Sequence, residues 1–206
     1  SAGVLYGDGA VGGVINVITD QAFPQDFRKV SIFSGSFGTN GVSSSLSTSI
    51  DNGGHFYLSA SGQSTDGYRD YTSNTKSYGA ISYYQNMSKG SVSIGLDQHR
   101  TDGFLSGIVL DSAASENRKA FRANSVQEKR SLRQTLWTKF ERSFNEKTLL
   151  QADLGRRISS QEGSYPLSSG SIDQLLTENS ISPKVVGRTS LLGKTNDFIL
   201  GLDFSQ

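Results

Sequence analysis

The feature that most constrains this chain is a strict two-residue alternation in its first third. Every second position from residue 43 to residue 49 is serine, and the alternate positions from 42 to 50 carry Val42, Ser44, Leu46, Thr48 and Ile50. Successive side chains of a β-strand point to opposite faces, so this pattern predicts a strand with one largely apolar face and one small, polar face. Residues 51–54 (DNGG) then form a strong hairpin signal.

A second alternating segment follows that turn. Its two faces carry Phe56, Leu58, Ala60 and Gly62 on one side and His55, Tyr57, Ser59 and Ser61 on the other. Similar segments predict further strands at residues 28–37, 77–85, 91–99, 131–140, 148–158, 184–192 and 197–204. The sequence therefore predicts an all-β fold of about nine up-and-down antiparallel strands.

The expected connections between these strands alternate in length. The short turns are at residues 51–54, 86–90, 143–147 and 193–196, and the longer loops are at residues 66–76, 101–129 and 159–183. Residues 112–123 and 172–176 are expected to form a short helix and a helical turn within two of these loops. Short connections at one end of the sheet and long ones at the other are typical of outer-membrane β-barrels.

The composition also favours a membrane barrel. Only 34% of the residues are hydrophobic, and the 206 residues include 23 glycines. A soluble core of this size usually carries more aliphatic residues, whereas a barrel strand needs only one apolar face. A soluble serine-rich β-sandwich or β-solenoid, resembling an adhesin-like binding domain, is the alternative. The serine-lined faces carry few of the charges that usually cover a soluble surface, which favours the barrel.

The glycine-rich segment at residues 1–19 allows two interpretations. Residues 7–12 (GDGAVG) match the G-x-G-x-x-G pattern of dinucleotide-binding turns. That pattern requires a helix immediately afterwards. The residues that follow, GVINVIT at 13–19, instead favour a strand, so the nucleotide interpretation lacks its structural context.

The second interpretation comes from a resemblance. The residues LYG at 5–7 and GAVGGVINVIT at 9–19 resemble the end of the plug domain of TonB-dependent outer-membrane receptors of the siderophore-receptor type. The resemblance implies the end of a plug domain at residues 1–19, a linker at 20–26 and the N-terminal part of a transmembrane barrel at 27–206. The chain is thus expected to be a fragment of a larger plugged barrel.

The resemblance also implies a function. Receptors of this family lie in the bacterial outer membrane and import scarce ligands, such as ferric siderophores, with energy supplied by TonB. The expected partners are outer-membrane lipid, TonB through a segment missing here, and an iron-siderophore or similar small ligand. In the plug segment, six residues are expected to act structurally: Tyr6, Gly7, Gly9, Gly12, Gly13 and Asn16.

Ligand-binding residues are expected in the long loops, since exposed loops often carry function. The candidates are the tyrosines and arginines of three loops: Tyr68, Arg69, Tyr71, Arg118, Arg122 and Tyr165. The resemblance implies that aromatic and polar residues of the lumen and outer loops hold the ligand.

Other chemistry has little support in the sequence. His55 and His99 lie in separate expected strands without partners at metal-ligand spacing, so no metal site and no cofactor are expected. Asp51, Asp66 and Asp102 are interpreted as turn residues, and no G-x-S-x-G nucleophile motif occurs. The protein is therefore expected not to be an enzyme. A net charge of +1 gives no electrostatic case for nucleic acid as a partner.

Overall fold

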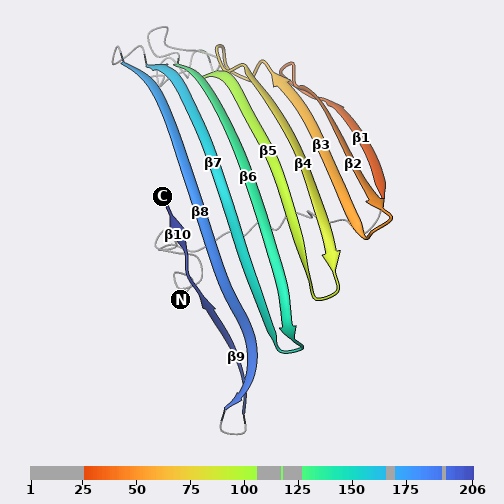
Figure 1. Cartoon of the computed structure of the whole chain (residues 1–206). Coiled ribbons are helices and arrows are strands. Elements are labelled where there is room, and N and C mark those ends of the chain that lie inside the picture. Colours follow the sequence, from red (N-terminus) through yellow and green to blue (C-terminus); the bar gives the residue numbers. More distant parts are fainter. Residues whose placement is uncertain (1–25, 106–116, 118–126, 166–169, 192–193) are drawn as a thin grey trace.

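The computed structural model describes residues 26–105, 117, 127–165, 170–191 and 194–206. These residues form one curved antiparallel sheet (Figure 1). Its strands are β1 (Phe27–Ser34), β2 (Asn40–Ile50), β3 (Gly54–Thr65), β4 (Asn74–Met87), β5 (Gly90–Leu105), β6 (Gln127–Asn145), β7 (Thr148–Tyr165), β8 (Gly170–Leu191), β9 (Lys194–Gly201) and β10 (Phe204–Ser205).

Every strand from β1 to β8 pairs with its neighbours in sequence, so the topology is up-and-down. β9 and β10 both pair with β8, on the side that β7 leaves free, and together they occupy one strand position. The sheet therefore has nine strand positions, with β1 at one edge and β9 and β10 at the other. The predicted all-β, up-and-down fold is confirmed.

The pairing register defines two chemically distinct faces. Leu46, Leu58, Ile81, Leu96 and Leu136 are direct partners across β2 to β6 and so lie on one face, which we call the apolar face. The next register row runs through Ser47, Tyr57, Ser82, Gly95 and Trp137 and lies on the opposite, polar face. The alternation in the sequence therefore extends across the sheet as continuous rows.

Burial on the two faces runs opposite to hydropathy. On the apolar face, Leu58, Ile81 and Leu96 are 49–51% exposed, whereas Ser47 and Ser82 on the polar face are only 2% and 7% exposed. No large hydrophobic side chain among the described residues is buried. A water-soluble sheet buries its apolar face, so the described sheet has the opposite organisation. No second sheet packs against it in the described part, which leaves the sandwich alternative without its core.

Within the described ranges, no helix is long and apolar enough to cross a membrane.

Large and small side chains interlock on the polar face. Ser47, Ser82 and Gly95 are buried in the row that also contains the rings of Tyr57 and Trp137. A Cβ atom placed on Gly95 would lie 2.3 Å from the Trp137 ring. Glycine is therefore required here for close approach of the indole, and not for an unusual backbone conformation.

This packing predicts that Gly95→Ala destabilises the intact barrel by about 1–3 kcal/mol, because the added methyl group must displace the Trp137 ring. Gly79→Ala is the matched control. Gly79 lies on the apolar face of the adjacent strand, and its added Cβ would meet nothing within 4 Å. Urea unfolding of both variants in lipid vesicles measures the difference. Equal stabilities would contradict the proposed packing.

The short turns are confirmed. The connections at 51–53, 88–89 and 146–147 contain two or three residues each, and β8 and β9 form the last hairpin. At the opposite end, the 66–73 connection is also confirmed as longer. The expected short helix at 112–123 lies outside the described residues.

Several expectations at the end with the long connections are wrong. The strands lengthen from 8 residues in β1 to 22 in β8. The expected loop at 159–183 is almost entirely strand, because β7 continues to Tyr165 and β8 begins at Gly170. The expected helical turn at 172–176 is paired with residues 159–163 of β7.

The expected loop at residues 101–129 is also shorter than predicted. β5 extends to Leu105 and β6 begins at Gln127, so both ends of the expected 101–129 loop are strand. Asp102, expected in a turn, lies in β5 and accepts hydrogen bonds from Arg100. In each case the neighbouring strand's hydrogen-bond ladder extends the strand beyond the alternating sequence, since pairing overrides weak local preference.

The chain enters β1 through a hydrogen-bonded anchor. One carboxylate oxygen of Asp26 accepts hydrogen bonds from the backbone N–H and the hydroxyl of Ser49, each at 2.6 Å. These bonds, that from the hydroxyl first, hold the pKa of the Asp26 carboxyl below its ordinary value of 3.8. The anchor ties the last residue of the expected linker to the end of β2.

The lowered pKa gives a pH prediction. Stabilisation from Asp26 is fully present above about pH 4 and is lost as the pH falls through the lowered pKa, because protonation removes the charged acceptor. Ser49→Ala should raise the pKa of Asp26 toward 3.8, whereas Ser43→Ala in the same strand should leave it unchanged. Carboxyl NMR titration measures this directly, and an unchanged pKa in Ser49→Ala would contradict the anchor.

Candidate functional site

The polar face is the candidate functional surface, because aromatic and charged side chains from several strands meet there. Toward the long connections, Tyr78, His99 and Arg133 are direct partners across β4, β5 and β6. Lys76 lies on the same face two residues from Tyr78, and Lys129 lies four residues from Arg133. Sequence reasoning missed this group, because the residues are distant in sequence and only the register brings them together.

Farther along the sheet, opposite charges on the polar face are paired. Arg157 lies 3.1 Å from Glu178, and Lys184 lies 3.9 Å from Asp153, in both cases between β7 and β8. Lys139 lies 5.8 Å from the centre of the Trp137 ring. The polar face thus carries paired charges beside its aromatic rings.

Three of the expected ligand residues share one loop. Tyr68, Arg69 and Tyr71 lie in the connection between β3 and β4, and both tyrosines are about half exposed. The Tyr68 ring packs edge-on against Phe37, with ring centres 5.3 Å apart. Phe37 belongs to the connection between β1 and β2. The Asp66 N–H donates to the Phe37 carbonyl at 2.9 Å and so also joins the two connections.

The structure does not bring Tyr165 to this group. Its backbone ends β7, three strand spacings from β4, or about 14 Å. Arg118 and Arg122 lie outside the described residues, as do the plug residues Tyr6, Gly7, Gly9, Gly12, Gly13 and Asn16. The ligand-binding role of the loop residues therefore stays a prediction.

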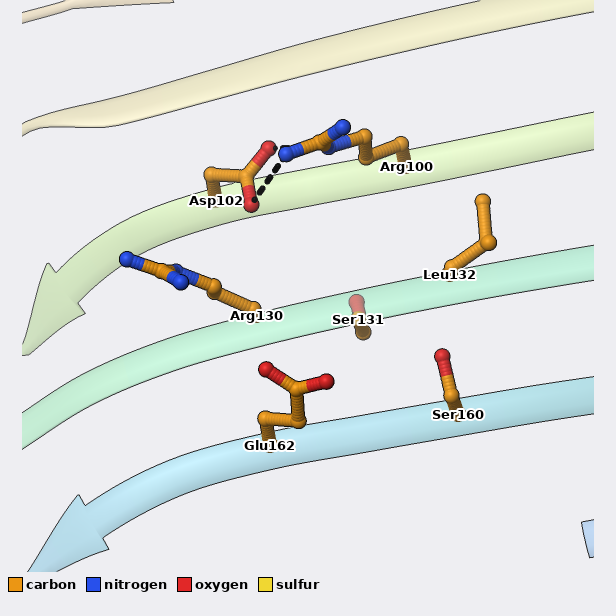
Figure 2. Close-up of a pocket in the computed structure, with 7 residues that line it drawn as sticks. All are labelled: Arg100, Asp102, Arg130, Ser131, Leu132, Ser160 and Glu162. Atoms are coloured by element: carbon orange, nitrogen blue, oxygen red, sulfur yellow. Dashed lines mark hydrogen bonds and ion pairs between the residues drawn. The ribbon is translucent and has the colours of Figure 1, made fainter. Parts of the chain in front are cut away.

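The pocket of Figure 2 lies on the other side of the sheet. It has a volume of about 220 Å³ and is lined by Arg100, Asp102, Arg130, Ser131, Leu132, Ser160 and Glu162. Except for Ser131, these residues lie in the register rows of the apolar face. Its lining charges balance, because two arginines face Asp102 and Glu162. Arg100 pairs with Asp102 at 2.6 Å, and Arg130 pairs with Glu128, outside the lining, at 2.7 Å. This open groove is a charged margin beyond the apolar rows, and it faces away from the polar face.

Metal binding has no geometric support in the described ranges, which contain no group of three or more potential metal-binding side chains. His55 and His99 share the polar face, but their register rows are six residues apart along β5, about 20 Å. The two histidines therefore cannot share a metal ion.

Comparison with known proteins identifies the fold. No family model matches the sequence, and no curated protein matches it. The structure is similar to the crystal structure of the closed form of the ferric-catecholate import receptor Fiu from E. coli K12, with a TM-score of 0.77 and 16% sequence identity. The match covers 98% of this chain and 34% of that receptor, so the chain spans about a third of the receptor's length. The chain has the fold of part of a TonB-dependent receptor barrel, as the sequence predicted.

Proposed function

We propose that this chain is part of an outer-membrane active-transport receptor that binds a scarce ligand, with a ferric siderophore as the expected class, and imports it with energy from TonB. The observation that carries the proposal is the inverted burial of the sheet. Exposed leucine and isoleucine on one face and buried serine on the other suit a wall between lipid and a polar lumen. The fold likeness to an import receptor supports the same role.

The height of the apolar surface matches a membrane. On β5, the apolar face carries Val92, Ile94 and Leu96 between the short turn and Gln98, and Gln98 accepts a hydrogen bond from Gln134 at 2.8 Å. This segment, residues 90–98, is close to the roughly 9–11 residues of a tilted spanning strand. Charged residues then dominate the same face beyond Gln98. In outer-membrane barrels the longer loops are extracellular, so the long connections would lie outside the cell.

Aromatic residues mark the other margin. The rings of Phe56 and Tyr83 lie 4.8 Å apart on the apolar face, near the short turn between β2 and β3. The Tyr83 hydroxyl donates to Gln85, and Gln85 in turn donates to the Asn52 carbonyl at 2.9 Å. A tyrosine with its ring in lipid and its hydroxyl in a polar network suits the membrane interface.

We assign residues 1–19 to the end of a plug domain, 20–26 to a linker and 27–206 to barrel strands. The plug glycines would permit close packing inside the lumen. Nine strand positions do not close a sheet of this curvature, and we propose that they belong to a plugged barrel in the size class of 22 strands. The protein would act as a transporter and not as an enzyme.

Uptake measurements test this function. The intact receptor is expressed in a bacterial strain that lacks its own siderophore receptors, and radioactive iron is supplied as ferric siderophore. Uptake is expected to require both the receptor and TonB. Uptake that continues without TonB would contradict the proposed active transport, and uptake of no iron complex would contradict the ligand class.

A further inference from the structure

The strongest unassigned feature is an unpaired cationic group on the polar face of β4 to β6. Tyr78, His99 and Arg133 lie in one register row, and Lys76 and Lys129 lie on the same face toward the long connections. We call these five residues the cationic row, after the register row of Tyr78, His99 and Arg133 that forms its centre. None of the sequence-based ligand candidates belongs to it.

The cations of the cationic row lack close ion-pair partners in the described part of the chain. Lys76, Lys129 and Arg133 form no ion pair with another described residue. By contrast, Arg157 and Lys184 on the same face both have carboxylate partners. The nearest carboxylate by register is Asp97, which lies on the same face of β5, two residues from His99 toward the short turns. The cationic row is therefore a local excess of positive charge in a chain whose net charge is only +1.

The dimensions of the row limit what it can bind. Tyr78 and Arg133 are two strand spacings apart, about 10 Å. Arginine and lysine donate charge-assisted hydrogen bonds to anionic oxygens, and the tyrosine hydroxyl adds a neutral donor. A ligand about 10 Å wide with several anionic oxygens could contact all three register partners at once.

We propose that the cationic row selects an anionic iron chelate over a neutral one, with Arg133 as its central residue. This inference rests on the proposed transport function and adds the charge class of the ligand. Lys76 and Lys129 extend the positive surface toward the long connections, where a negatively charged ligand would first be attracted. Charge complementarity, rather than shape, is the basis of the selection.

The test compares two probes of similar size on the intact receptor in detergent. One is a ferric tris-catecholate complex with a charge of −3, and the other is a neutral ferric tris-hydroxamate complex. Arg133→Gln is expected to weaken binding of the anionic complex by roughly tenfold or more, as for loss of one charge-assisted hydrogen bond. Binding of the anionic complex should also weaken with salt, and the triple variant with Lys76→Gln and Lys129→Gln should show a smaller salt dependence.

Arg130→Gln is the matched control, because Arg130 lies in the same strand three residues away but on the opposite face. It should bind the anionic complex as the wild type does. Resistance to unfolding in SDS without heating checks that each variant still forms a barrel.

Unchanged binding of the anionic complex by the triple variant would overturn this inference, and the proposed transport function would still stand. Equal loss of both complexes in Arg133→Gln would also overturn it, since that result indicates shape and not charge. A wild-type receptor that neither binds nor imports any iron complex would instead refute the proposed function.

Discussion

Leu58→Arg is expected to destabilise the intact barrel by about 2–4 kcal/mol, the cost of placing an arginine on the lipid face near the bilayer midplane. Leu58 is 51% exposed and lies in the central apolar row, between Leu46 and Ile81. In water, arginine at a half-exposed strand position would be well tolerated. The large effect arises only if lipid covers this face. Urea unfolding in lipid vesicles measures it.

Ser59→Arg provides the matched control for Leu58→Arg. Ser59 is the next residue of β3, and its register partners on the polar face are Ser45 and Ala80, both small. The long arginine side chain can extend its charged end along the polar face from this position. The control should therefore lose less than about 1 kcal/mol, in line with a surface substitution. Similar losses at both positions would contradict a lipid-covered apolar face.

The 206-residue chain expressed alone is expected to aggregate in buffer without detergent. Within the residues that the structure describes, its sheet has two unpaired edges, β1 and the β9 and β10 position, and an apolar face without cover. Unpaired edges and exposed apolar surface both promote association between chains. In detergent, the chain alone should give no protease-resistant barrel whose mobility changes on heating. A discrete soluble monomer in gel filtration would contradict the membrane fold.

The sequence predicts the part of the sheet that carries the apolar rows well. The alternation in β2 and β3 gives each strand one apolar and one polar face, as the proposed position between lipid and a lumen requires. The DNGG turn fixes the first hairpin because its residues favour tight reversal. The same requirement repeats along the chain, so the strand order and the short turns are predictable from local patterns.

The sequence predicts the outer part poorly, also for a physical reason. Beyond the apolar rows, charged residues lie on both faces, as at Arg130 and Lys129, and strict alternation is no longer required. Residues 171–179 of β8 (SIDQLLTEN) therefore lack the two-residue pattern and yet form a strand, because β7 supplies a continuous row of backbone partners. Strand lengths there depend on pairing, which no local pattern records.

The cationic row shows a second limit. Tyr78, His99 and Arg133 come from three strands, and only the exact register places them side by side. A shift of one residue between β5 and β6 would move Arg133 to the next position and break the row. The shared loop of Tyr68, Arg69 and Tyr71 was predictable because they are neighbours in sequence, and their ligand-binding role stays a prediction.

The most direct test of the central claim is a cysteine scan along β3 of the intact receptor in lipid vesicles. This sequence contains no cysteine, so each introduced thiol in this region reports on one position. Cysteines at 56, 58 and 60 should be reached by a quencher carried on lipid chains, and those at 57, 59 and 61 by a water-soluble thiol reagent. This two-residue pattern is the predicted result. Access of the water-soluble reagent to positions 56, 58 and 60, without lipid quenching there, would contradict the account.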